Sequence, residues 1–238
     1  MKQNSFLKNI TISKVIISIL IIFFIALFTY DTTHKTSDTY TNSKAWNSNM
    51  TLGNLDSPNV LVEYTDYFCS YCAEVHEAIE NNNFKKDYID TDKVRLENRI
   101  TIMLSKVSTN TEQGAEAAYC AADQNKYWEY SDDIISRIKT DYFDKGVGVK
   151  NVASPKKIDK LPVSYFTESA KTVGLNTETF EACVSSEAHK DEIEDNTQKA
   201  INLGVDGLPY LVINDYKASG FSGGYNGLLN VLKAGGVK

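Results

Sequence analysis

Two cysteines separated by two residues are the part of this chain best suited to chemistry. Cys69 and Cys72 enclose Ser70 and Tyr71, follow an apolar run and precede a stretch of helical character. A cysteine at the start of a helix faces unpaired backbone N–H groups and the positive end of the helix dipole, so its thiolate is stabilised. A second cysteine one turn later lies close enough to close a small disulfide. The pair therefore predicts a thiol–disulfide redox centre, and we expect a Cys69–Cys72 disulfide in the resting protein.

Strands and helices of ordinary length must hold this pair in place. Residues 59–67 are apolar and β-rich, as in a buried strand, and residues 72–85 place apolar side chains on one face, as in a helix. The order strand, helix, strand, helical block, strand, strand, helix predicts an α/β fold. The remaining expected elements are a strand at 94–103, helices within 110–140, 162–173 and 177–202, strands at 210–214 and 217–221, and a helix at 224–234.

Composition indicates a folded protein rather than a disordered or nucleic-acid-binding one. The chain has 238 residues, of which 42% are hydrophobic and 24% charged, enough for one elaborated domain with a sizeable core. The net charge is −6 and the isoelectric point about 5.2, so no basic surface for nucleic acid is expected. The sequence contains no appended dimerisation domain, and we expect a monomer.

The amino terminus predicts a membrane location. Three lysines precede an uncharged apolar run at residues 15–30, and the first acidic residue is Asp31. This pattern is typical of an export signal or a signal anchor. Because no small-residue cleavage site follows, we expect residues 1–14 in the cytoplasm, a single-pass transmembrane helix at 15–30 and the catalytic part outside the cell membrane; a cleaved signal peptide is the alternative. Residues 31–51 are polar and predict a flexible linker.

Three stretches of the sequence resemble the DsbA-like branch of the thioredoxin superfamily. They are residues 60–72, which end in the cysteine pair, residues 117–130, which end in Tyr-Trp-Glu-Tyr, and residues 204–214, which contain Gly-Leu-Pro before a strand. The resemblance extends from Leu52 to the C-terminus. It implies a thioredoxin domain, at 52–107 and 203–238, interrupted by an inserted α-helical domain at 108–202.

The resemblance also assigns roles to individual residues. Cys69 would be the exposed, attacking sulfur, and Cys72 the buried, resolving one. Pro209 would be a cis proline facing the disulfide, and its neighbour Leu208 would offer backbone groups to a bound peptide. Glu63, six residues before Cys69, would be a buried acid that exchanges a proton with Cys72 or raises the pKa of that thiol.

The implied activity is the introduction of disulfides into unfolded exported proteins with reduced cysteines. A quinone-linked membrane protein of the DsbB-like or VKOR-like kind would then reoxidise the cysteine pair, and no bound cofactor is implied. Many relatives have proline where this chain has Ser70, so a thioredoxin-like reductase or an isomerase remains an alternative. A non-catalytic thioredoxin-fold binding module, with a merely structural pair, is the other alternative.

Cys120 and Cys183 form a second pair within the expected insert. Some relatives carry a second disulfide there, and an extracytoplasmic location favours one; two buried free thiols or a second redox pair are the other readings. A metal site of Cys69, Cys72 and His76 is a weak alternative, because zinc usually takes four ligands, often from two paired motifs. We therefore expect no metal.

Overall fold

The computed structural model describes residues 47–80, 83–149 and 156–238. The predicted cytoplasmic segment 1–14, the predicted transmembrane helix 15–30 and the linker up to residue 46 lie outside the described residues. Within the described ranges, every helix is too short or too polar to cross a bilayer.

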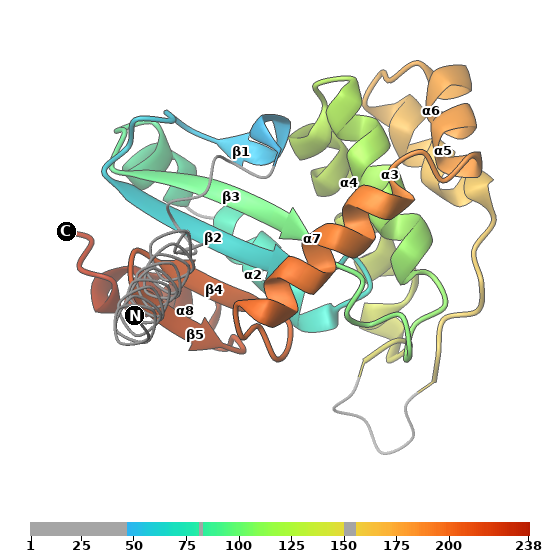
Figure 1. Cartoon of the computed structure of the whole chain (residues 1–238). Coiled ribbons are helices and arrows are strands. Elements are labelled where there is room, and N and C mark those ends of the chain that lie inside the picture. The colour runs from blue at the N-terminus through green and yellow to red at the C-terminus, as the bar shows by residue number, and fades with distance from the viewer. Residues whose placement is uncertain (1–46, 81–82, 150–155) are drawn as a thin grey trace, which may run out of the picture. The chain divides into compact units, whose positions relative to one another are not determined.

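A five-stranded mixed sheet forms the centre of the fold (Figure 1). The strand order is β1-β3-β2-β4-β5, with β2 and β3 parallel and the other neighbours antiparallel. The strands are β1 (Thr51–Leu52), β2 (Asn59–Thr65), β3 (Val94–Ile100), β4 (Tyr210–Ile213) and β5 (Tyr216–Ser219).

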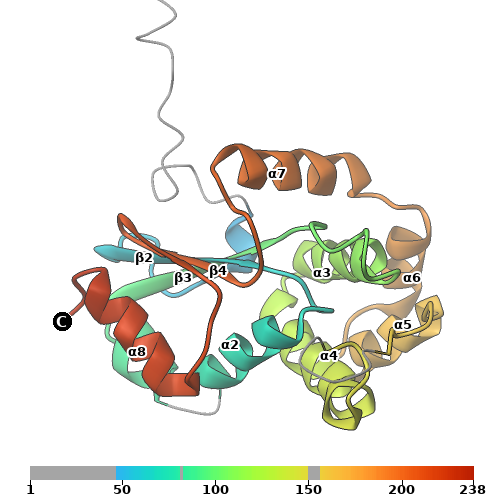
Figure 2. The same cartoon turned by 90° about the horizontal axis from the view of Figure 1, so that it is seen from below.

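Helices cover both faces of this sheet (Figure 2). Helices α2 (Ser70–Glu80) and α8 (Gly224–Ala234) lie on one face and α7 (Lys190–Asn202) on the other. Side chains alternate along β2, so Leu61 packs in the core cluster on the α2 and α8 side while Val62 packs in the cluster that contains Ala200 of α7. Burial on both faces explains the apolar run Val60-Leu61-Val62 in β2.

The chain between β3 and β4 forms a helical insert with a core of its own. Its buried residues include the small side chains of Ala117, Ala118 and Ala121 and the aromatic rings of Tyr130 and Phe166. The expected α/β fold with a helical insertion is thus confirmed. Most of this core comes from the helices α3 (Thr111–Asp123), α4 (Tyr127–Asp141), α5 (Val163–Thr172) and α6 (Thr177–Ser185).

Two predicted helical stretches are each divided in two. The stretch 110–140 breaks between α3 and α4, where Asn125 has a φ of 57°, and the stretch 177–202 breaks between α6 and α7, where Glu187 has a φ of 51°. A residue with positive φ cannot continue a right-handed helix. Two short helical segments, η2 (Lys85–Ile89) and η3 (Phe143–Lys145), add to the expected elements.

The last five residues of the predicted linker, 47–51, are folded. They form the 3₁₀ turn η1 (Ser48–Met50) and the start of β1, which pairs Thr51 with Glu97. Met50 is 1% exposed and belongs to the core of the insert, and the Asn49 side-chain amide donates to the Ala122 carbonyl at 2.8 Å. The linker prediction is wrong here because a single buried methionine and a two-residue strand carry too short a pattern to be detected.

Candidate active site

Cys69 lies immediately before the first residue of α2. Its carbonyl oxygen accepts the backbone N–H groups of Cys72, at 3.0 Å, and Ala73, at 3.1 Å, so it occupies the N-cap position of the helix. Its sulfur accepts the Cys72 N–H at 3.3 Å. The sulfur therefore sits where backbone N–H groups and the helix dipole stabilise a negative charge.

Both sulfurs of the pair are free thiols and both residues are buried. The structure therefore describes the dithiol and not the disulfide expected of the resting protein. Cys69 is 5% exposed and Cys72 is 3% exposed, so the expectation of an exposed Cys69 is wrong for this conformation. Tyr67 and Phe68, which lead into Cys69, are buried in the core of the insert and draw the cysteine inward.

Glu63 lies in the interior beneath the cysteine pair. It is 2% exposed, stands opposite Asn98 of β3 and Leu211 of β4, and shares a sheet face with Leu61 on the side covered by α2. Burial raises the pKa of Glu63 to about 8, and a hydrogen bond with Thr65 acts in the opposite direction. The carboxyl group is thus protonated at neutral pH and can supply a proton.

Cys72 lies close enough to this acid for the charge on Glu63 to act on its thiol. Burial raises the pKa of Cys72 well above its usual value; interactions with Cys69 and the charge on Glu63 raise it further. A buried thiol with this environment holds its proton until a neighbouring base takes it. The arrangement therefore suits Cys72 as the sulfur that exchanges a proton with Glu63.

The remaining predicted residues lie at the same edge of the sheet. The Leu208–Pro209 peptide bond is cis, and Tyr210 pairs with Tyr64, so Pro209 stands beside the end of the strand that leads to Cys69. Pro209 is buried and Leu208 half-buried. On the helix side, Ser70 and Tyr71 line a hollow of about 210 Å³. Its other lining residues are Ala73, Glu74, Lys139, Phe143, Asp144 and Val149.

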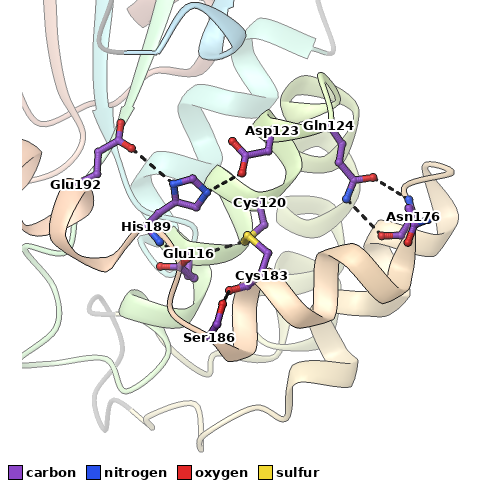
Figure 3. Close-up of a disulfide and its surroundings, with 9 residues drawn as sticks. All are labelled: Glu116, Cys120, Asp123, Gln124, Asn176, Cys183, Ser186, His189 and Glu192. Atoms are coloured by element: carbon purple, nitrogen blue, oxygen red, sulfur yellow. Dashed lines mark hydrogen bonds and ion pairs between the residues drawn. A yellow bond between two sulfur atoms is a disulfide. The ribbon is translucent and has the colours of Figure 1, made fainter.

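Cys120 and Cys183 form the disulfide that the sequence favoured (Figure 3). The bond joins α3 to α6 across 63 positions of sequence, with 5.9 Å between the two Cα atoms. Glu116 and His189 lie beside it. The Glu116 carboxylate accepts the His189 backbone N–H at 2.7 Å, and the His189 ring meets Asp123 at 2.8 Å. The Cys120–Cys183 disulfide therefore links two helices of the insert and is separate from the Cys69–Cys72 site.

His76 does not join the cysteine pair. It is 7% exposed, and its Nε2 atom lies 3.2 Å from Asp132 of α4, with Glu80 also close. The Lys85 ammonium group pairs with Glu80 and lies 4.0 Å from Asp132, so a lysine side chain already neutralises part of the charge of these carboxylates.

Asp66, a residue to which neither motif nor resemblance assigns a role, is 2% exposed and lies between β2 and Cys69. The signal that could have found it is an aspartate opening a short turn, a position where its side chain commonly bonds to the backbone two residues on.

Comparison with known proteins agrees with this geometry. The thioredoxin family model matches residues 46–226. The chain is 24% identical over 202 residues to the probable disulfide bond formation protein D of Bacillus anthracis, covering 84% of this chain and 85% of that protein. It is also 26% identical over 184 residues to a putative protein-disulfide oxidoreductase of Rickettsia prowazekii, covering 66% and 65%.

Solved structures share the fold. Oxidised BdbD of Bacillus subtilis matches with a TM-score of 0.60 at 16% identity, covering 78% of this chain and 91% of that chain. Wolbachia pipientis alpha-DsbA1 matches with a TM-score of 0.58 at 19% identity, covering 79% and 90%. The family match spans most of the sequence and all of the site described above, and the chain belongs to the thioredoxin family.

Proposed function

We propose that this protein is a thiol:disulfide oxidoreductase that introduces disulfide bonds into exported proteins with reduced cysteines. The observation that carries the proposal is the position of the Cys69 sulfur at the start of α2, 3.3 Å from the Cys72 N–H, with the buried acid Glu63 close enough to act on the second cysteine. The names of the relatives in Bacillus anthracis and Rickettsia prowazekii support the same activity.

The reaction proceeds by two exchanges. A substrate thiolate attacks the Cys69 sulfur of the Cys69–Cys72 disulfide, the bond between the two enzyme sulfurs breaks, and Cys72 leaves with the electron pair and takes up a proton. A second substrate thiolate then attacks the substrate sulfur of the mixed disulfide, and Cys69 leaves as a thiolate. Two substrate thiols become one disulfide, and the enzyme becomes a dithiol.

Each side chain of the site has a place in this sequence. Glu63 lies beside Cys72 and is placed to exchange a proton with that sulfur as the pair is reduced and reoxidised. The helix start stabilises the Cys69 thiolate, which speeds its departure and favours the reduced enzyme. The segment at Leu208 and Pro209 offers backbone groups to the substrate strand, and the hollow beside Ser70 and Tyr71 can receive a substrate side chain.

The partners and location follow as further proposals. The dithiol passes its electrons to a quinone-linked membrane protein of the DsbB-like or VKOR-like kind. Residues 15–30 anchor the protein in the cell membrane with the catalytic part outside, which keeps the two proteins on one surface and raises their effective concentration. Extraction of membranes at alkaline pH tests the anchor: the full chain stays in the pellet, and a chain shortened to begin at residue 46 is released.

Transfer of a disulfide tests the activity. The oxidised protein, mixed with reduced and unfolded ribonuclease, is expected to lose its own disulfide as ribonuclease gains one. Cys69→Ser abolishes the transfer. Cys72→Ser leaves Cys69 without a resolving thiol, so in a separate assay its attack on an insulin disulfide stops at the mixed disulfide. The double variant Cys120→Ser/Cys183→Ser, which lacks the other disulfide, keeps the transfer. Undiminished transfer by Cys69→Ser would refute the proposal.

A further inference from the structure

We propose that Asp66 is a positioning residue for Cys69: its side chain closes the turn that delivers the reactive sulfur to the start of α2. This inference rests on the proposed function, because it concerns the same cysteine. Asp66 lies three residues before Cys69, follows the last residue of β2 directly and is 2% exposed.

Two hydrogen bonds of Asp66 shape the chain between the strand and the helix. Its Oδ1 atom accepts the Phe68 backbone N–H at 2.8 Å, and its carbonyl oxygen accepts the Cys69 backbone N–H at 3.1 Å. Together they hold a tight turn of four residues that ends at Cys69. The Cys69 sulfur then lies 3.3 Å from the Cys72 backbone nitrogen. The contact that stabilises the thiolate therefore depends on the turn that Asp66 closes.

The helical insert fixes the same turn from outside. The Phe68 ring packs against Gly114 of α3 so closely that a Cβ added there would lie 2.9 Å from a ring carbon, and it meets the Phe166 ring of α5 at 6.2 Å. Tyr67 shares a hydrogen bond of 2.7 Å with Ser131 of α4. The two residues that follow Asp66 are therefore anchored to three helices. These contacts hold the turn in the conformation that places Cys69 at the N-cap of α2.

A carboxyl group is a costly choice for so buried a position. Burial raises the pKa of Asp66 to about 6, and the hydrogen bond from the Phe68 N–H acts against that rise. Burying such a group costs free energy unless its hydrogen bonds offset the loss of water. The Phe68 N–H offsets part of this cost within the turn that precedes the reactive cysteine, and a hydrogen bond with the Thr111 side chain lowers the pKa as well.

A positioning role and a simple charge effect predict opposite changes in the stability of the Cys69 thiolate when the Asp66 carboxylate is removed. If the turn positions the sulfur, removing the Oδ1 acceptor weakens the contact with the Cys72 N–H and destabilises the Cys69 thiolate. If Asp66 acted only through its negative charge, removing that charge would stabilise the thiolate. Asparagine keeps the acceptor and removes the charge, so Asp66→Asn and Asp66→Ala separate the two cases.

The experiment measures the equilibrium of the full chain with glutathione, together with the ultraviolet absorbance of the Cys69 thiolate at neutral pH. Asp66→Ala is expected to shift the equilibrium about 2- to 5-fold toward the oxidised protein and to lower the thiolate absorbance, as fits the loss of one contact at a helix N-terminus. Asp66→Asn restores both readouts to the wild-type values. If Asp66→Ala does not fold, Asp66→Glu takes its place, because it keeps the charge and is too long for the turn.

The control is Tyr119→Phe, which removes a buried hydrogen bond with Asn196 elsewhere in the insert and leaves both Asp66 bonds intact. It lowers stability and leaves the equilibrium with glutathione unchanged. Disulfide transfer to ribonuclease by the wild-type chain, run in parallel, reports failure of the proposed function separately. The inference is overturned if Asp66→Ala matches the wild type, or if Asp66→Asn shifts the equilibrium as far as Asp66→Ala does.

Discussion

At the scale of single residues, the site separates two thiols by their surroundings. Cys69 caps α2 and receives a backbone N–H, whereas Cys72 is buried beside Glu63, and the causes that raise its pKa are burial and its neighbours. Motif and resemblance together predicted both cysteines, Glu63 and Pro209. The burial of Cys69 could not be predicted, because Phe68 and the helices against which it packs come together only in the folded chain.

The raised pKa of Glu63 has a consequence for stability. The folded protein holds this proton up to about pH 8, whereas the unfolded chain releases it near the ordinary glutamate pKa of 4.5. The wild type therefore loses stability as the pH rises through this window, while Glu63→Gln does not suffer that loss. As the pH rises from 4.5 to about 8, we expect the unfolding free energy of Glu63→Gln to increase relative to that of the wild type by about 2 kcal/mol or more.

Urea unfolding of both chains at each end of the window measures this difference. Asp66, whose pKa burial raises to about 6, contributes equally to the two chains and cancels. A constant difference in unfolding free energy between the wild type and Glu63→Gln across the window would show that Glu63 ionises normally in the folded state.

At the scale of elements, the insert and the sheet meet at the segment that carries Cys69. Long periodic elements such as α8 and α5 were predicted within a residue of their observed ends, because their apolar positions repeat over several turns. The breaks at Asn125 and Glu187 were missed, because a non-glycine residue with positive φ leaves no reliable mark in a sequence.

Gly114 tests the packing of the insert against the active-site segment. Gly114→Ala adds a Cβ at 2.9 Å from the buried Phe68 ring, so we expect a net loss of about 1–3 kcal/mol despite the better helix propensity of alanine. Gly207→Ala, whose Cβ meets nothing within 4 Å, is the matched control and stays near the wild-type stability. Thermal unfolding compares the two; a Gly114→Ala chain as stable as the control would show that Phe68 moves aside at little cost.

The disulfide between α3 and α6 is expected to stabilise the insert without taking part in exchange. Closing a loop of 63 residues contributes roughly 4 kcal/mol on the chain-entropy model, less any strain. Cys120→Ser/Cys183→Ser should therefore unfold at markedly lower denaturant concentration while keeping its disulfide transfer per folded molecule. Loss of transfer in the folded variant would assign this pair a redox role instead.

At the scale of the whole molecule, one edge of the sheet collects the parts of the site from distant stretches of sequence. The end of β2 leads to Cys69, the start of β4 brings Pro209, and the insert closes the segment between β2 and α2. Order of elements and family resemblance predicted this architecture. They did not predict that residues 47–51 fold onto it, because those contacts depend on Met50 alone among large apolar residues.

The central claim is that the Cys69–Cys72 pair is an oxidant whose reduced form is stabilised at the start of α2. The equilibrium of the pair with glutathione tests it most directly. We predict a reduction potential close to about −120 mV, as for a strong oxidant of this superfamily, and a value near about −270 mV, that of a thioredoxin-like reductant, would contradict the account.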